Sequence, residues 1–301
     1  MRPRFGCVVL TTGSRPDDLR RALDSLLAQQ DVEADIVVVG NGWEPVDLPP
    51  GVRGVGLRED RGIPAGRNAG VPHTTGELLF FLDDDAALAE PDALAFVART
   101  LDHPPKGVRP LHAGSTRDVG LVQLRVEAAE GGARSRDWVP RLRVGDPGRP
   151  SDVAALWEGA VGIPRELFER VGGWPAEFRF VHEGVDLAWR VIDAGYRVRY
   201  AAERSVRHPS PGRATARHGY STYYGARNRV WLARRHLPAP LGVLFVASFA
   251  VRTLPHLRSS AQRRAALHGY RDGLRSDPGA RRRLRARTLW RMTRAGRPPL
   301  L

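Results

Sequence analysis

The stretch Leu78-Leu79-Phe80-Phe81-Leu82-Asp83-Asp84-Asp85 passes without a break from apolar side chains to three carboxylates. Its short apolar part follows Gly76 and is typical of a buried strand. Adjacent carboxylates repel one another unless a cation lies among them, and hard divalent cations bind carboxylate oxygens. Because open α/β sheets bind ligands at the carboxyl ends of their strands, the stretch predicts a metal and phosphate site. The alternative is a solvated acidic turn before a helix that begins at Pro91.

Two apolar runs earlier in the chain predict neighbouring strands. Residues 7–10 form a first strand, and the continuous β-branched run Ile36-Val37-Val38-Val39 is typical of a strand buried on both faces of a parallel sheet. Leucines at helical spacing between the runs predict an amphipathic helix, so the order is strand, helix, strand. No Gly-x-Gly-x-x-Gly follows the first strand, which argues against a dinucleotide cofactor. Residues 103–152 predict irregular chain around one strand at 119–126.

The composition bounds the cellular setting. Cys7 is the single cysteine, so the sequence predicts neither a disulfide framework nor a cysteine-based zinc site. This agrees with a reducing compartment, and we expect a cytoplasmic protein. The first residues lack the pattern of a signal peptide, and no uninterrupted apolar run reaches the roughly 20 residues of a spanning helix.

Positive charge is concentrated at the C-terminal end. Residues 252–301 contain 14 Arg and 2 Asp, whereas the whole chain has a net charge of +14. An apolar run, 237–251, precedes this segment and is expected to be too short to span a membrane. Together they predict a C-terminal extension, 236–301, on the anionic inner face of the plasma membrane. The alternative is a helix that packs on the preceding domain. Nucleic acid is an unlikely partner, since the rest of the chain is near neutral.

Five motifs in order carry a resemblance to a known family. They are a first strand with a Thr/Arg-Pro loop, Val37-Val38-Val39-Gly40-Asn41-Gly42, the glycine-rich segment 62–70 around Arg67-Asn68, the stretch that ends at Asp85, and Val171-Gly172-Gly173-Trp174 before an acidic helix start. Over residues 5–235 the chain resembles inverting glycosyltransferases of family 2. The resemblance implies an α/β GT-A fold, with a mixed, mostly parallel sheet flanked by helices, in a domain of residues 1–235.

The resemblance also implies a nucleoside-diphosphate-sugar donor. The nucleotide-sugar site would comprise Thr11, Arg15, Asn41, Arg67, Asp83 and Asp84. Asp83 would face the ribose or the base. Gly40 stands where many members have an aspartate that meets the base, so a uridine or a deoxythymidine donor, UDP or dTDP type, is open.

A divalent metal is implied at the same place. Asp85, with Asp83, would hold Mg²⁺ or Mn²⁺ against the diphosphate, where a metal stabilises the charge of the leaving group. His208 matches a position where some members have a third metal ligand. A structural role for this single histidine is the alternative.

An inverting transfer requires a base for the acceptor hydroxyl. The family usually supplies it in an acidic motif after the Gly-Gly-aromatic segment, but Gly184 stands where an aspartate is common. We therefore expect Glu183 to be the base, with Asp186 second. A first-turn carboxylate favoured by the helix dipole is the alternative for Glu183. Trp174 is expected to floor the acceptor site, or else to pack under the sheet.

These features predict a metal-dependent glycosyltransferase for hexosyl or deoxyhexosyl transfer to a glycan or lipid-linked acceptor, in cell-envelope polysaccharide or glycolipid synthesis. A catalytically impaired GT-A scaffold and a polyanion-binding protein are the alternatives from other classes. A sugar-nucleotide pyrophosphorylase would need a glycine-rich loop after its first strand, and residues 11–16 contain one glycine.

Overall fold

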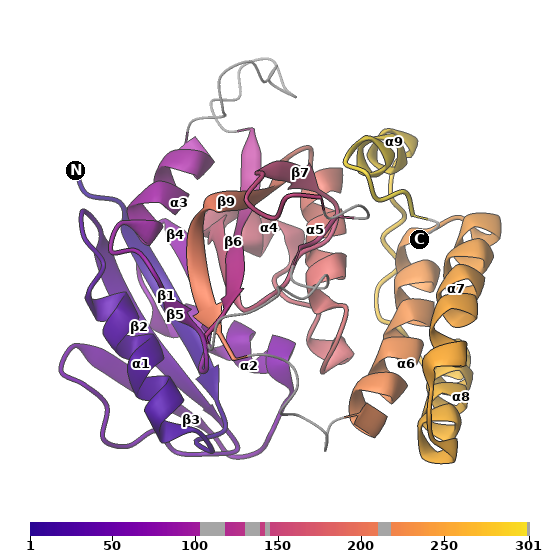
Figure 1. The fold of residues 1–301 in the computed structure, drawn as a ribbon, viewed down its shortest axis with the longest axis horizontal. Coiled ribbons are helices and arrows are strands. Elements are labelled where there is room, and N and C mark those ends of the chain that lie inside the picture. The colour runs from indigo at the N-terminus through magenta and orange to yellow at the C-terminus, as the bar shows by residue number, and fades with distance from the viewer. Residues whose placement is uncertain (103–117, 130–138, 142–144, 210–217, 300–301) are drawn as a thin grey trace.

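A computed structural model describes residues 1–102, 118–129, 139–141, 145–209 and 218–299 (Figure 1). In these residues nine strands form one sheet, in the order β3-β2-β1-β4-β8-β6-β9-β5, with β7 paired to β9. The strands are β1 (Arg4–Thr11), β2 (Glu33–Asn41), β3 (Val52–Leu57), β4 (Leu78–Asp83), β5 (Ala87–Leu88), β6 (Val119–Ala128), β7 (Ser151–Val153), β8 (Ala160–Pro164) and β9 (Arg197–His208).

The sheet is mixed, and its longest ladders are parallel. β1 pairs in parallel with β2 and β4, β2 with β3, and β6 with β9, whereas β8 runs antiparallel between β4 and β6. The expected mixed, mostly parallel sheet is therefore confirmed, as is the strand expected at 119–126. Of the region expected to be irregular, residues 103–117, 130–138 and 142–144 lie outside the described residues.

Both faces of the sheet are covered, as the continuous apolar strands require. Successive side chains of a strand point to opposite faces, so Val8 and Phe81 belong to one core and Cys7 and Phe80 to the other. The helices before residue 200 are α1 (Pro16–Leu27), α2 (Ile63–Gly70), α3 (Ala93–Asp102), α4 (Arg165–Val171) and α5 (Glu183–Asp193). α1 and α3 supply one core, and α4 and α5 supply the other.

The glycine-rich segment forms helix α2, which lies very close to the sheet. A Cβ at Gly66 would lie 2.5 Å from Cδ1 of Leu10, and a Cβ at Gly70 would lie 2.6 Å from Cγ1 of Val8. Larger residues would push the helix away from β1. The glycines therefore fix the depth of α2, and this depth places Arg67, on the same helix, in the protein interior.

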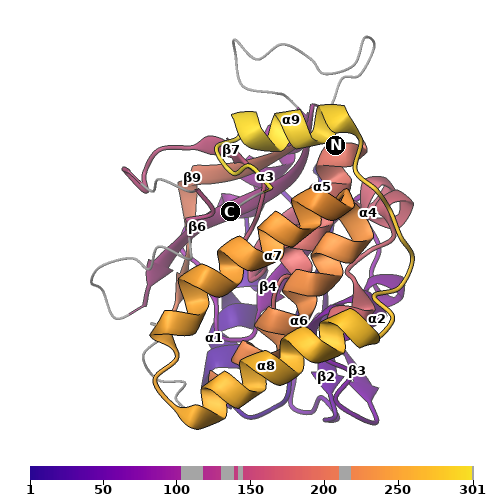
Figure 2. The ribbon, with the colours of Figure 1, turned by 90° about the vertical axis from the view of Figure 1, so that its right-hand side faces the viewer.

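The C-terminal helices stand beside the sheet and form a separate layer (Figures 1 and 2). They are α6 (His218–His236), α7 (Ala239–Thr253), α8 (Ser260–Arg275) and α9 (Ala286–Arg294). Close contact of α8 with α6 depends on Gly269, where a Cβ would lie 2.3 Å from the carbonyl oxygen of Tyr223. Figure 2 shows α7 and α8 on the outer side of this layer. The domain boundary expected near residue 235 stays a prediction.

The apolar segment after α6 is longer than expected. Residues 239–256 are long and apolar enough to cross a membrane by length and composition alone, and 11% of the segment is buried. The sequence-based estimate stopped at residue 251, whereas the helix continues to Thr253 and a 3₁₀ turn follows at Leu254–His256. Its length therefore does not exclude a membrane-spanning segment.

Candidate active site

The carboxyl ends of the parallel strands meet at one edge of the sheet. Thr11, Asn41 and Asp83 end β1, β2 and β4, and His208 ends β9. β5 runs antiparallel to β9 and begins two residues after Asp85. This short pairing brings the acidic stretch next to the end of β9, although 123 positions separate Asp85 from His208.

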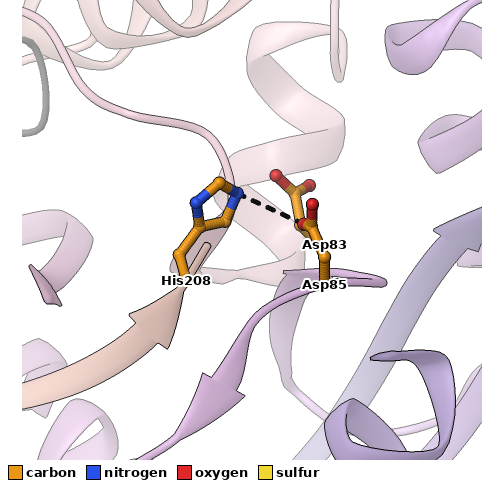
Figure 3. A group of neighbouring side chains, drawn as sticks. All are labelled: Asp83, Asp85 and His208. Carbon is orange, nitrogen blue, oxygen red and sulfur yellow. Dashed lines mark ion pairs between the residues drawn. The ribbon is translucent and has the colours of Figure 1, made fainter. Parts of the chain in front are cut away.

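Asp83, Asp85 and His208 form a possible metal site (Figure 3). One potential ligand atom from each of the three lies within 4.8 Å of the others, and Nε2 of His208 is 3.2 Å from Oδ1 of Asp85. Two carboxylates and one imidazole form a donor set that suits a divalent ion. The grouping that the sequence predicted is therefore present, including the distant histidine.

The charges around Asp85 favour its ionised form. Burial alone would raise the pKa of Asp85, but the hydrogen bond and charge of His208, together with Arg15, lower it. Burial lowers the pKa of His208, yet the hydrogen bond and charge of Asp85 outweigh this effect and raise it. A divalent ion bound here would interact favourably with the ionised form of Asp85.

Arg15 connects two of the three consecutive carboxylates. Its guanidinium forms ion pairs with Asp85 and, at 2.5 Å, with Oδ1 of Asp84. Oγ1 of Thr11 donates to Oδ2 of Asp84 at 2.6 Å. Asp84 is 4% exposed, and burial raises its pKa to about 6 against the opposing effect of Thr11 and Arg15. These two buried groups bind each other and hold Arg15 at the site, and their predicted contacts with the nucleotide stay a prediction.

Arg67 binds the remaining carboxylate of the stretch. Its side chain is 2% exposed, and Nη2 lies 2.5 Å from Oδ1 of Asp83. The guanidinium stands 5.1 Å from the ring centroid of Trp174. Nη1 has no hydrogen-bond partner among the residues that the structure describes. Arg67 is thus a buried cation beside the metal site, with one donor unused.

Trp174 is a core residue, which corrects its predicted role in the acceptor site. Its side chain is 1% exposed. The ring packs edge-on against Phe81, at 5.2 Å between ring centroids, and also against Phe168. Trp174 also contacts the guanidinium of Arg67, so it has no exposed ring face for an acceptor.

Asn41 organises a turn, and its predicted contact with the nucleotide stays a prediction. Its Nδ2 donates to Oδ1 of Asp60 at 2.6 Å, and its Oδ1 accepts from the backbone N–H of Arg61 at 2.8 Å. Oδ1 of Asp60 also accepts from the backbone of Gly62. The side chain therefore joins the end of β2 to the start of α2, which carries Arg67.

Glu183 is the first residue of α5 and is buried. It is 3% exposed, and its Oε2 has no hydrogen-bond partner in the described part of the chain. Burial, followed by the negative charge of Glu158, raises the pKa of Glu183 to about 8. Arg67 and Asp83 also act on this carboxyl group electrostatically. An unpaired buried carboxylate with a raised pKa has the properties of a general base.

Glu158 is the residue that the sequence reasoning missed. Its Oε1 accepts a hydrogen bond from the backbone N–H of Gly184 at 2.8 Å. Burial raises its pKa, and the charge of Arg67 opposes the rise. One sequence signal was available, because Glu158 and Gly159 directly precede the apolar strand 160–164. In the structure the carbonyl of Gly159 accepts a hydrogen bond from the backbone N–H of Asp83, so Glu158 lies next to the acidic stretch.

The backbone before Glu183 is strained and is held by α6. Arg179, Val181 and His182 have φ angles of 61°, 66° and 71°, which non-glycine residues rarely adopt. Nδ2 of Asn228 donates to the carbonyls of Phe178, Phe180 and Val181 at 2.9, 2.7 and 2.8 Å. This buried amide was not predicted either, because its partners lie about fifty positions away.

Asp186 belongs to a buried ion-pair network, and its role as the second base stays a prediction. It is 1% exposed and accepts from Nε of Arg190 at 2.6 Å, and it lies 2.7 Å from Nε2 of His236. Burial would raise its pKa, but Arg190 and His236 hold it well below its usual range. Through His236 the network ties α5 to α6.

The fold and the strand-end cluster define the chain as a GT-A glycosyltransferase. More particularly, it belongs to glycosyl transferase family 2, whose model matches residues 7–172, more than half of the 301 residues. The O-antigen biosynthesis protein RfbC of Myxococcus xanthus is 26% identical over 225 residues. That match covers 68% of this chain but 17% of RfbC, so the chain spans about a sixth of that relative's length.

Solved structures share the fold at low sequence identity. Mannosyltransferase PcManGT of Pyrobaculum calidifontis, in complex with GDP-Man and Mn²⁺, has a TM-score of 0.53 at 19% identity, over 98% of this chain and 73% of its own. S. aureus TarS 1–349 in complex with UDP-GlcNAc has a TM-score of 0.59 at 13% identity, over 90% and 81%. GalNAc-T7 with UDP, GalNAc and Mn²⁺ has 0.61 at 15% identity, over 91% and 56%.

Proposed function

We propose that the chain transfers a sugar from a nucleoside-diphosphate donor to a glycan or lipid-linked acceptor, with inversion at the anomeric carbon. The observation that carries this proposal is the group Asp83, Asp85 and His208 at the carboxyl edge of the sheet. Family membership supports the transferase class, and the similarity to RfbC supports a role in polysaccharide synthesis of the cell envelope. Relatives in fold were solved with GDP-Man, UDP-GlcNAc or UDP, so the donor base stays open, and UDP or dTDP types are the expectation.

Different residues of the site would have different roles in a single-displacement transfer of the sugar. Asp83, Asp85 and His208 would hold the metal, which supplies a Lewis acid for the charge of the departing diphosphate. Because imidazole is a better ligand for transition metals than for Mg²⁺, the histidine favours Mn²⁺. Arg15 sits beside Asp85, where it can pair with phosphate oxygens. Glu183 takes the proton of the attacking acceptor hydroxyl.

The first test is thermal unfolding with a panel of nucleoside diphosphates, each with and without Mn²⁺. A ligand that binds only the folded protein raises the melting temperature. We expect a metal-dependent rise with one nucleotide, absent in Asp85→Asn, and then release of that nucleotide from its sugar conjugate in the presence of acceptor. Without a shift for any nucleotide, the impaired-scaffold or polyanion-binding alternative takes precedence.

We further propose that the outer helices rest on an anionic membrane surface on the cytoplasmic side. Val243 and Val251 on α7 are 68% and 73% exposed, and Leu267 and Leu274 on α8 are 61% and 67% exposed. An apolar groove of about 800 Å³ lies among α6, α7 and α8, with Arg234 and Arg281 in its lining. Exposed apolar side chains among arginines are the pattern of an interfacial helix. Binding to vesicles with phosphatidylglycerol, and not to neutral vesicles, is the expected result.

A further inference from the structure

Position 184 departs from the family pattern, because glycine stands where an aspartate is common. Gly184 is the second residue of α5, directly after Glu183. A helix N-terminus offers unpaired backbone N–H groups and favours negative charge nearby. A glycine at this position removes a carboxylate from the place where the acidic motif is expected to act.

The structure shows another carboxylate in that place. Oε1 of Glu158 accepts from the backbone N–H of Gly184 at 2.8 Å. A Cβ built on Gly184 would lie 2.3 Å from this oxygen and 2.7 Å from Cγ and Cδ of Glu158. Any side chain at 184 would therefore collide with the carboxylate, which occupies the space that the aspartate of other members would need.

Glu158 and Glu183 also share their surroundings. After burial, the charge of Glu158 raises the pKa of Glu183, and Arg67 is the cation that acts on both carboxyl groups. Burial disfavours two charges on such a pair, as in other paired carboxylates. Oε2 of Glu183 has no partner among the described residues, whereas Oε1 of Glu158 is held by the helix N-terminus. The two carboxyl groups thus differ in their hydrogen-bond partners.

We propose that Glu158 supplies the second carboxylate of the base pair and replaces, from outside α5, the acidic side chain missing at position 184. This inference rests on the proposed function. In the step, the acceptor oxygen forms its bond to the anomeric carbon and its proton passes to Glu183. The bond from that carbon to the diphosphate oxygen breaks, and its electron pair leaves with the diphosphate. Glu158 is a positioning residue, which keeps Glu183 aligned and basic.

The decisive experiment moves the carboxylate back to position 184. Four variants are compared: Glu158→Gln, Glu158→Ala, Gly184→Asp and the double variant Glu158→Ala/Gly184→Asp. We expect Glu158→Gln to lower kcat by about 100-fold, with little change in the KM for the donor. Glu166→Gln, an exposed glutamate on α4, is the matched control and is expected to keep the wild-type kcat.

Rescue distinguishes this role from simple packing. Gly184→Asp alone is expected to be destabilised by the collision with Glu158, whereas the double variant is expected to regain at least about tenfold in kcat over Glu158→Ala. A folded double variant no faster than Glu158→Ala would overturn the proposal, and so would a wild-type kcat for Glu158→Gln.

A double-mutant cycle measured by thermal unfolding separates this inference from the proposed function. If the wild type shows neither nucleotide binding nor turnover, the proposed function has failed. The spatial part is then tested by unfolding alone. Gly184→Ala is expected to lower the melting temperature in the wild type and to lower it much less with Glu158→Ala, because the collision is gone. Equal effects of Gly184→Ala in both backgrounds would show that Glu158 does not fill the space.

Discussion

Two buried arginines, one beside the sheet edge and one in the C-terminal layer, differ in their partners: the first pairs with a carboxylate, and the second contacts a carbonyl and aromatic rings. Arg67 is 2% exposed and pairs with Asp83 at 2.5 Å. Arg229, on α6, is 4% exposed and contacts α7 through the carbonyl oxygen of Phe245 and the rings of Phe245 and Phe249. Burial, then the charges of other arginines, lowers the pKa of Arg229 to about 8.

The difference shows how each region handles charge. At the sheet edge, carboxylates and arginines are matched, so that a metal or a diphosphate can exchange with existing partners. In the C-terminal layer, positive charge exceeds negative charge, and aromatic faces and carbonyls substitute for carboxylates. The first region thus has paired charges, which would suit the metal and diphosphate proposed above, and the second has the excess positive charge on which the proposed membrane contact depends.

The largest effect is expected at the metal site. Asp85→Asn removes a ligand and one partner of both Arg15 and His208. We expect kcat to fall about 10³-fold, since electrostatic stabilisation of the leaving group is lost. Steady-state release of the nucleoside diphosphate measures the change. Asp24→Asn, at an exposed position of α1, is the control, and equal losses in both variants would contradict a local role.

The network around Asp186 is expected to matter for stability. Asp186→Asn leaves Arg190 and His236 without their carboxylate in a buried position, which should cost about 3 kcal/mol of the free energy of unfolding. Urea unfolding followed by circular dichroism gives this value. At a temperature where the variant stays folded, its kcat should be near that of the wild type. A 100-fold loss of kcat with normal stability would support Asp186 as a base.

Asn228 on α6 is expected to connect the C-terminal layer to the segment before Glu183. Asn228→Ala removes three hydrogen bonds to the strained segment before Glu183. Because small misplacements of a reacting group are costly, we expect kcat to fall up to about 100-fold, with the donor KM nearly unchanged. Nucleotide binding with Mn²⁺ should persist. A change in donor KM alone would place the effect of Asn228 at the metal site instead.

The raised pKa of Glu183 predicts a pH effect of defined sign. Its folded pKa is about 8, above the ordinary 4.5, so between these values the folded state binds more protons than the unfolded state. The contribution of Glu183 to the free energy of unfolding is therefore expected to fall as pH rises from 5 to 8. Glu183→Gln should reduce this fall by about 1 kcal/mol or more, and should abolish the rise of kcat/KM toward pH 8. An identical pH dependence in both proteins would exclude the shift.

The smallest effect is expected on the outer surface. Leu267→Glu with Leu274→Glu places charge on exposed positions of α8, so folding should be unaffected. Binding to phosphatidylglycerol vesicles should weaken about tenfold, as apolar contact is replaced by repulsion. Leu27→Glu, exposed on α1, is the matched control. Equal vesicle binding by the double variant and the wild type would remove α8 from the proposed membrane contact.

Much of the site could be anticipated because its motifs are local. Apolar runs that end in polar residues marked the strand ends, and parallel strands bring such ends together. Asp83 and Asp85 follow from this rule. His208 required the family resemblance, since its partner Asp85 is far away in the sequence and meets it through the pairing of β5 with β9.

The sequence by itself determined the strands of the sheet, the acidic strand end, the family and the basic C-terminal segment, because these depend on side-chain periodicity and composition. Only the tertiary structure decided which carboxylates have hydrogen-bond or ion-pair partners and what those partners are. Asp186 pairs with His236, fifty positions away, and Glu158 reaches Gly184 across 26 positions. Periodicity specifies which face a residue points to, whereas the partner it meets there depends on how distant elements pack.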